Sequence, residues 1–185
     1  MSPASEILTE RLRLIPITPE FVRAFYRNRD ELSRLLRAGV PADWPVDPVI
    51  LEILKDQLDN PSAFIWSDYI YIHRQDKKVI GDGGFKGPPD AGGLVEIGYA
   101  VLPEYRGMGL ETEAARALLE RAFSPSKVKS VCAETTVNGR ASMAVLQKAG
   151  MQRCGARHDE EDGDLYCWRI LREEFEKIPT SRVEF

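Results

Sequence analysis

Two glycines, an arginine and the start of a helix lie close together in R-G-M-G-L-E, residues 106–111. An apolar, β-branched run precedes them over Leu94–Leu102, Pro103 ends that run, and a helical pattern continues to about Phe123. Glycines let the backbone adopt unusual dihedral angles and approach a ligand closely. The first amides of a helix have no intrahelical partner and lie at the positive end of the helix dipole. The stretch therefore predicts a strand, a turn and a helix start that together bind an anion such as a phosphate group.

Two common phosphate-binding loops fit this stretch poorly. A P-loop requires Lys followed by Ser or Thr at the end of the glycine run, and neither is present. A dinucleotide-binding loop requires G-x-G-x-x-G, but Thr112 occupies the place of the third glycine. Glu134 does stand near the distance at which that fold has an acidic residue, but the fold repeats βαβ units and this sequence has only one.

Hydrophobic periodicity predicts the elements that position the loop. One strand–helix–strand unit spans residues 94–136, and a unit of this length implies a right-handed parallel crossover. The fold class that follows is a mixed α/β fold with a mostly antiparallel central sheet, one βαβ crossover and helices on both faces. We expect strands at 7–15, 64–73, 79–86, 94–102, 128–136, 151–157 and 165–171, and helices at 19–37 with a break near 28–30, at 47–58, from the loop to 123 and at 140–149.

Length and composition indicate one ordinary globular domain. The chain has 185 residues, which suits a single domain over 1–185 with a core of about 7–171 and a polar, loosely held tail at 172–185. A net charge of −4 gives no general attraction to nucleic acid. Three scattered cysteines without metal-ligand spacing, Cys132, Cys154 and Cys167, favour reduced thiols in the cytoplasm. We expect no metal site, no membrane span and no secretion signal.

Four stretches carry a resemblance to a known family. They are T-E-R-L-R-L near the N-terminus, V-I-G-D-G-G-F from Val79, V-E-I-G-Y-A-V-L-P-E-Y-R-G-M-G-L-E-T-E-A from Val95, and A-S-M-A-V-L-Q-K-A-G-M from Ala141. Their order and spacing resemble the GNAT superfamily of acyl-CoA-dependent N-acetyltransferases, specifically its Rim type, which acetylates protein N-termini and other amines. The resemblance spans roughly Leu8 to Ile170 and implies the acyl-CoA N-acyltransferase fold.

The resemblance also implies where a co-substrate would bind. In that family the strand before the loop splays from its neighbour, the pantetheine of acetyl-CoA pairs with the exposed strand edge, and the pyrophosphate sits on the loop amides. Two residues of the late helix and the turn before it lie near the pantetheine and its thiol. Carried over residue by residue, the acetyl-CoA contacts are Val101, Arg106, Gly107, Met108, Gly109, Leu110, Glu111, Asn138 and Ser142.

The sequence departs from the family pattern in two places. The loop motif R/Q-x-x-G-x-G/A normally ends in Gly or Ala, and here it ends in Glu111, whose charge would repel a phosphate. Glu111 also suits the first turn of a helix because it complements the dipole. At the late helix, Gly139 replaces an Asn. Aliphatic Val145 and Leu146 stand where many members of the family have a Tyr that acts as the acid and reprotonates the thiolate.

The chemistry expected of an acetyltransferase assigns the remaining candidates. Glu96 is the predicted general base for a primary amine that attacks the thioester directly, with Asp82 and Glu134 as weaker candidates. Ser142 is the predicted acid that reprotonates the thiolate, although a helix-start role suits it equally. The acceptor would be a protein N-terminus or a small cationic amine. The acidic turn 159–164 could attract such a cation, although a solvated loop is the commoner role.

Two functional classes therefore stay open. The first is an amine N-acetyltransferase that uses acetyl-CoA and exists as a monomer or homodimer. The second is a GNAT-fold binding or regulatory protein in which Glu111 has weakened or abolished acetyl-CoA binding. The intact Arg106-Gly107-x-Gly109 and Glu96 favour the first class, whereas Glu111 and the missing Tyr favour the second.

Overall fold

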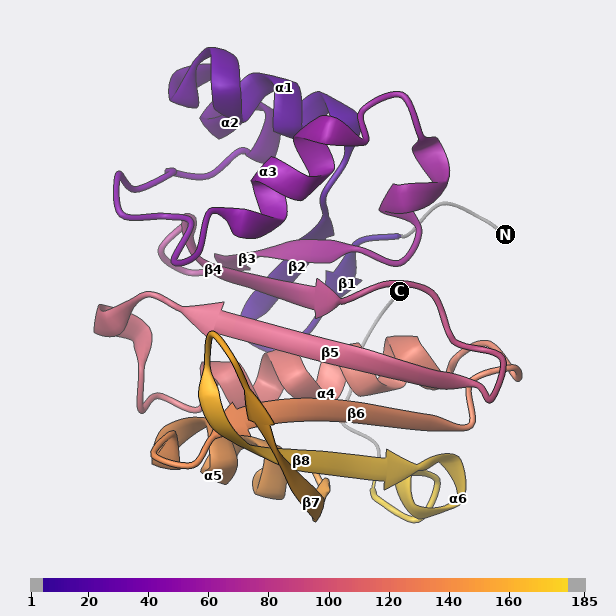
Figure 1. The fold of residues 1–185 in the computed structure, drawn as a ribbon. Helices are drawn as coiled ribbons and strands as arrows, with labels where there is room; N and C mark the ends of the chain where they lie inside the picture. Colours follow the sequence, from indigo (N-terminus) through magenta and orange to yellow (C-terminus); the bar gives the residue numbers. More distant parts are fainter. Residues whose placement is uncertain (1–4, 180–185) are drawn as a thin grey trace.

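A computed structural model describes residues 5–179 of the chain. In this part of the chain, eight strands form one sheet in the order β1-β2-β3-β4-β5-β6-β8-β7 (Figure 1). Strands β5 and β6 run parallel, and the other neighbouring pairs are antiparallel, so the predicted fold class is confirmed. The strands are β1 Ile7–Leu8, β2 Leu12–Pro16, β3 Asp68–His73, β4 Lys78–Phe85, β5 Leu94–Val101, β6 Ser130–Thr136, β7 Gln152–Asp159 and β8 Gly163–Leu171.

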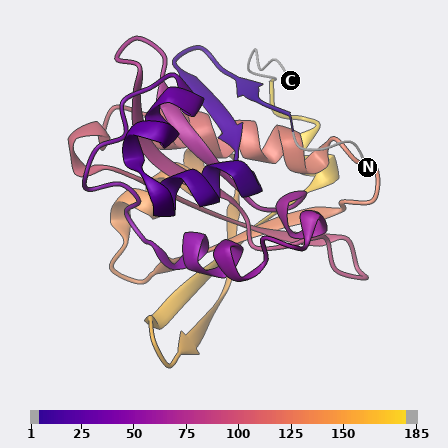
Figure 2. The ribbon, with the colours of Figure 1, turned by 90° about the horizontal axis from the view of Figure 1, so that it is seen from above.

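Helices cover both faces of the sheet. Three N-terminal helices, α1 Pro19–Arg27, α2 Arg29–Leu36 and α3 Val49–Asp56, pack on one another over one face. Helices α4 Leu110–Phe123 and α5 Arg140–Lys148 lie on the opposite face, with α4 running behind β5 and β6 in Figure 1. Figure 2 shows the β7–β8 hairpin projecting away from the rest of the molecule. Short 3-10 helices, η1 Pro61–Phe64 and η2 Pro103–Tyr105, and the four-residue helix α6 Arg172–Phe175 complete the described elements.

Side-chain caps explain the predicted break between the first two helices. The Thr18 hydroxyl accepts a hydrogen bond from the Phe21 amide at 3.3 Å and begins α1. Asn28 ends α1 and begins α2, because its side chain accepts from the Asp30 amide at 2.8 Å. Arg37 then adopts a left-handed conformation, with φ of 53°, and ends α2. The break near 28–30 is therefore confirmed.

Small side chains hold α4 against the sheet. The buried face of α4 includes Leu110 and four alanines, and alanines let a helix axis approach the strands beneath it. Because α4 contacts β2, β5 and β6, its N-terminus is fixed at the end of β5, where the glycine loop lies. The alanines of this face are Ala114, Ala115, Ala117 and Ala122.

Several predicted strands have different bounds in the structure. The first strand is divided, because Thr9 makes a turn in which its hydroxyl accepts from the Leu12 amide at 3.0 Å. Strand β3 begins only at Asp68, since residues 61–64 form a 3-10 helix. The last hairpin is longer than predicted and leaves a turn at residues 160–162, so part of the acidic segment is strand.

The expectation of a loosely held tail is wrong for residues 172–178. The ring of Phe175 stacks on Phe123 of α4, with 4.9 Å between ring centroids. Ile178 packs over Gly150, and a Cβ atom added at Gly150 would collide with Cδ1 of Ile178. Apolar contacts therefore bind this segment to the core; residues 180–185 lie outside the described part of the chain.

Candidate active site

The loop between β5 and α4 has the geometry of an anion cradle. Gly107 and Gly109 adopt left-handed φ angles of 74° and 80°, which a residue with a Cβ atom rarely adopts. A Cβ at Gly107 would meet no atom within 4 Å, so its conformation, rather than crowding, requires glycine there. No side chain caps the helix that begins after Gly109, and its first amides remain available to a ligand. The loop therefore fits a phosphate group.

A network from the N-terminal strand region holds this loop in place. The Glu113 carboxylate accepts hydrogen bonds from the Thr9 hydroxyl at 2.6 Å and from the Arg11 amide and Nε at 2.7 Å each. Arg11 also donates from its Nη1 to the Met108 carbonyl at 2.8 Å. These contacts fix the turn and the first helical turn relative to each other. The sequence does not reveal this role of Glu113, because its partners lie about a hundred residues earlier.

Strand β5 splays from β6 beside the cradle, as the resemblance implied. Pairing between the two strands covers only residues 94–96 of β5, whereas pairing with β4 continues over 97–101. The Leu102 amide donates to Ile80 of β4, so by antiparallel alternation the main chain of Val101 faces the gap. Gly98, Tyr99 and Ala100 are half-buried although they lie in a central strand, which shows that the gap is open to solvent.

The carbonyl of Val101 already has a partner within the loop. Arg106 is exposed, and its Nε donates to the Val101 carbonyl at 3.2 Å. This bond ties the loop to the end of β5 and leaves the gap-facing amide of Val101 without a role in the β4–β5 ladder. Of the predicted contacts, Met108 is exposed at the loop tip, while the Leu110 side chain is buried in the core.

The side chain of Glu111 lies partly inside the gap. It is half-buried, and burial raises its pKa while the nearby Arg106 guanidinium opposes that rise. The charge of Glu111 in turn contributes to the raised pKa values of Tyr99 and Tyr71, two residues whose pKa rises mainly because of burial. The carboxylate is therefore near Arg106 and the tyrosines, beside the uncapped amides of α4.

Helix α5 forms the second wall of the gap. Asn138 is exposed in the turn before it, and Ser142 is half-buried in its first turn. The Tyr99 hydroxyl donates to the Ser142 carbonyl at 3.2 Å, so it links β5 to α5 across the gap in addition to packing on the core. No hydrogen bond to the Ser142 hydroxyl is present among the described residues. The acid role of Ser142 stays a prediction.

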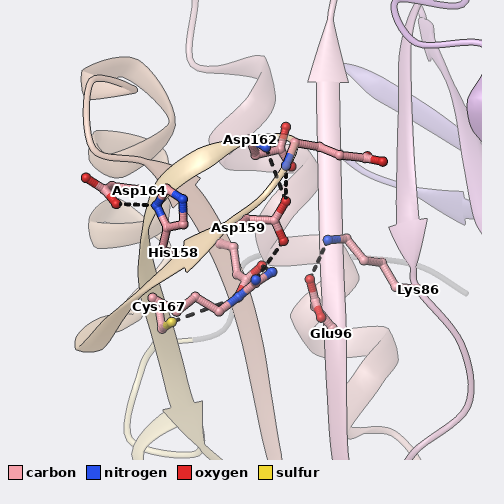
Figure 3. A network of polar contacts seen from close by, with 10 residues as sticks. Lys86, Glu96, His158, Asp159, Asp162, Asp164 and Cys167 are labelled. Atoms are coloured by element: carbon pink, nitrogen blue, oxygen red, sulfur yellow. Dashed lines mark hydrogen bonds and ion pairs between the residues drawn. The ribbon is translucent and has the colours of Figure 1, made fainter.

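The predicted base lies on the other face of the sheet from Tyr99 and forms an ion pair. Glu96 is half-buried, and its Oε1 lies 2.5 Å from Nζ of Lys86 (Figure 3). Glu134, a weaker candidate, accepts two hydrogen bonds from Arg157 at 2.6 and 2.7 Å, which lower its pKa. Asp82 is 6% exposed, and burial raises its pKa to about 7. Of the three carboxylates, Asp82 has no ion pair within the described residues.

Two carboxylates of the acidic segment, Asp159 and Asp164, have partners within the β7–β8 hairpin. Asp159 pairs with Arg157 at 2.7 Å and accepts from the Glu161 and Asp162 amides, and these contacts lower its pKa to about 2. Asp164 lies 2.8 Å from Nδ1 of His158 (Figure 3). These bonds support the interpretation of a solvated loop. Within residues 5–179, no three His, Cys, Asp or Glu side chains are grouped as metal ligands.

The comparisons with known proteins agree with this geometry. The family model for the acetyltransferase (GNAT) domain matches residues 11–152, and the chain therefore belongs to the GNAT acetyltransferase family. It is thus an acetyl-CoA-dependent N-acetyltransferase by family. The uncharacterized N-acetyltransferase YjdG of Bacillus subtilis (strain 168) is 28% identical over 148 residues, which cover 77% of this chain and 86% of YjdG.

Solved structures share the fold. One is AAC(6')-Ib in complex with paromomycin and acetyl-CoA, with a TM-score of 0.64 and 19% identity over 94% of this chain and all of that one. Another is a putative ribosomal-protein-serine acetyltransferase from Vibrio cholerae, with a TM-score of 0.64 and 16% identity over 92% of this chain and 99% of that one. At these identities the structures support the fold, and the acceptor of this protein must be inferred from its own residues.

Proposed function

We propose that this protein transfers the acetyl group of acetyl-CoA to a primary amine by direct attack of the amine on the thioester. The observation that carries the proposal is the uncapped, glycine-lined start of α4 at the mouth of the β5–β6 gap. The cradle suits the pyrophosphate and the gap suits the pantetheine arm. Acetyl-CoA would supply the activated acetyl group. Residues of the protein would bind it, polarise the thioester and transfer the protons.

The residues divide the chemistry between the two sides of β5. The gap-facing amide of Val101 is the proposed donor that polarises the thioester carbonyl. Glu96, on the opposite face and paired with Lys86, would take a proton from the amine through water. Ser142 would return a proton to the departing thiolate from the α5 side. Arg106, Gly107, Met108, Gly109 and Leu110 would bind the phosphates, and Asn138 would lie near the pantetheine.

The proposed acceptors are two particular kinds of primary amine. The sequence motifs resemble those of the Rim branch, and a putative ribosomal-protein-serine acetyltransferase from Vibrio cholerae shares the fold. AAC(6')-Ib, whose structure contains an aminoglycoside, also shares it. We therefore propose a protein N-terminus or a small cationic amine, acetylated by a single-domain monomer or homodimer in the cytoplasm. No helix of residues 5–179 is long and apolar enough to cross a membrane.

A second candidate function rests on Glu111. Because its carboxylate is half-buried beside Arg106, it occupies the positive site that a phosphate would need. A GNAT-fold protein with weakened acetyl-CoA affinity would then act through binding alone. This candidate can be tested, because it depends on the charge of Glu111.

Calorimetric titration with acetyl-CoA and with CoA distinguishes the two candidates. We expect saturable binding to the purified protein, followed by release of free thiol when a panel of primary amines is added. A Gly109→Ala variant serves as the control, because a Cβ there forces the loop out of its left-handed turn. Absence of binding at millimolar acetyl-CoA would rule out the enzyme. Binding without thiol release for any peptide or amine would favour the binding module.

A further inference from the structure

Two carboxylates, the buried Asp82 and the half-buried Asp68, lie next to each other on the face of the sheet opposite α4. Strand β3 pairs with β4 so that Asp68 faces Gly84 and Ile70 faces Asp82. Side chains two residues apart on a strand share a face, so Asp68 and Asp82 are diagonal neighbours on one surface. The indole of Trp44 faces Asp82 and partly offsets the rise in its pKa, which places the pair under the α1–α3 layer.

The pair lacks a compensating charge. No ion pair to Asp68 or Asp82 is present in the described part of the chain, and Oδ2 of Asp82 is buried without a hydrogen-bond partner. The closest cation that acts on Asp68 is Lys86, which pairs with Glu96, and Asp47 adds further negative charge near Asp82. Burial and mutual repulsion raise the pKa of Asp68 to about 8. A carboxylate without a partner is costly to keep charged in the interior of a protein, so a cationic ligand that pairs with these groups would be bound favourably.

The pair also lies beside the gap where acetyl transfer is proposed. Asp82 is directly opposite Ala100 on β5, one residue before Val101. Gly98 lies on the same face, and a Cβ atom there would meet only Lys86 Cε at 3.8 Å, so the space directly above Gly98 is open. Tyr99 and Glu111 occupy the other face. An amine that reaches the thioester from the α1–α3 side would therefore pass Asp68 and Asp82.

We propose that Asp68 and Asp82 form the acceptor subsite, which binds the substrate's primary amine as an ammonium ion and removes its first proton. This inference rests on the proposed acetyltransferase function and adds the binding residues and the charge of the acceptor. The ammonium N–H groups donate to the two carboxylates. One carboxylate takes a proton, which leaves a neutral amine whose lone pair attacks the thioester carbon. The second amine proton leaves through water to Glu96 as the C–N bond forms and the C–S bond breaks.

The charge of the pair suits one ammonium group. With pKa values of about 8 and about 7, the two carboxylates share roughly one proton near neutral pH. The charged groups that act on them are Asp47 and Lys86, and the buried Tyr71 on the other face stays protonated because burial raises its pKa. None of these supplies a positive charge in direct contact. A bound ammonium would therefore satisfy the pair.

Thermal unfolding without acetyl-CoA tests the inference. The probe is propylammonium chloride in the millimolar range at pH 7.5, compared with sodium and tetramethylammonium chloride at equal ionic strength. Tetramethylammonium carries the same charge but has no N–H donor. We expect propylammonium alone to raise the melting temperature saturably, because a ligand that binds only the folded state stabilises it. Asp82→Asn and Asp68→Asn should each weaken this binding at least 10-fold.

Matched variants separate a binding site from a structural feature. Asp43→Asn removes one exposed carboxylate from the loop that holds Trp44 and should leave propylammonium binding within 2-fold. Without ligand, Asp82→Asn should melt at or above the wild-type temperature, whereas a pair kept for stability would lower it. Equal stabilisation by all three salts, or unchanged binding in the Asp68→Asn/Asp82→Asn double variant, would overturn the inference. Because acetyl-CoA is left out, these results do not depend on the proposed transfer reaction, which is tested separately by acetyl-CoA binding and thiol release.

Discussion

Replacing Glu111 by Gln should tighten the binding of CoA about 10-fold. Gln has nearly the same shape, so the substitution removes the charge and keeps the first turn of α4. The carboxylate is half-buried beside Arg106, at the uncapped amides where a pyrophosphate would sit. Its removal therefore eliminates one repulsive interaction with the phosphates.

The magnitude follows from Coulomb's law. At about 6 Å and an effective dielectric constant near 20, two unit charges repel by about 3 kcal/mol. A Debye length of about 8 Å at physiological ionic strength roughly halves this, and about 1.4 kcal/mol corresponds to a factor of 10 in affinity. Salt provides an internal check, since the difference between Glu111→Gln and wild type should almost vanish near 1 M, where the Debye length is about 3 Å.

Calorimetry with CoA at low and high salt measures both effects. Glu113→Gln is the matched control, because it removes the same charge two residues along the same helix. The Glu113 carboxylate is bound by Thr9 and Arg11, so its loss should loosen the loop and bring no gain in affinity. Equal affinity of Glu111→Gln and wild type at low salt would refute the reasoning and show that the carboxylate does not face the phosphates. Binding by Glu111→Gln alone would support the second candidate function.

Three further predictions concern Arg11, the pair of Asp68 and Asp82, and Ser142. Arg11→Ala should destabilise the protein by about 1–3 kcal/mol in denaturant unfolding and weaken CoA binding, because it removes the Nε bond to Glu113 and the Nη1 bond to the Met108 carbonyl; unchanged values for both would contradict the role of Arg11. Asp82 and Asp68 have raised pKa values in the folded state, so the folded protein holds protons that the unfolded chain releases, and stability should fall as pH rises from about 4 to 8; melting curves of Asp82→Asn should show a shallower fall. Ser142→Ala should lower kcat about 100-fold with little change in KM if its hydroxyl reprotonates the thiolate, and an unchanged kcat would leave only a structural role.

The strand-loop-helix unit was predictable because all of its determinants are local. The apolar run, Pro103, the glycines and the start of α4 follow one another in sequence, and the structure confirms their order. The support for this unit was not predictable in the same way. Thr9, Arg11 and Glu113 are brought together only when β2 and α4 pack, and the pairing is not visible in any local pattern. The ion pair of Glu96 with Lys86 depends likewise on two strands meeting.

The acceptor subsite depends on a single irregularity that the sequence does not reveal. Counted back from the pairing of His73 with Lys78, a regular hairpin would place Asp82 opposite Tyr69, on the other face from Asp68. The structure instead has a register shift between Tyr71 and Ile72, which moves Asp82 opposite Ile70. A bulge of this kind shifts every later residue to the opposite face. The two carboxylates thus share a face because of the bulge, and the glycines beside them permit β4 to approach β5 closely. The bulge is the feature that most limits prediction from the sequence, and it is also the feature that creates the charged surface next to the gap.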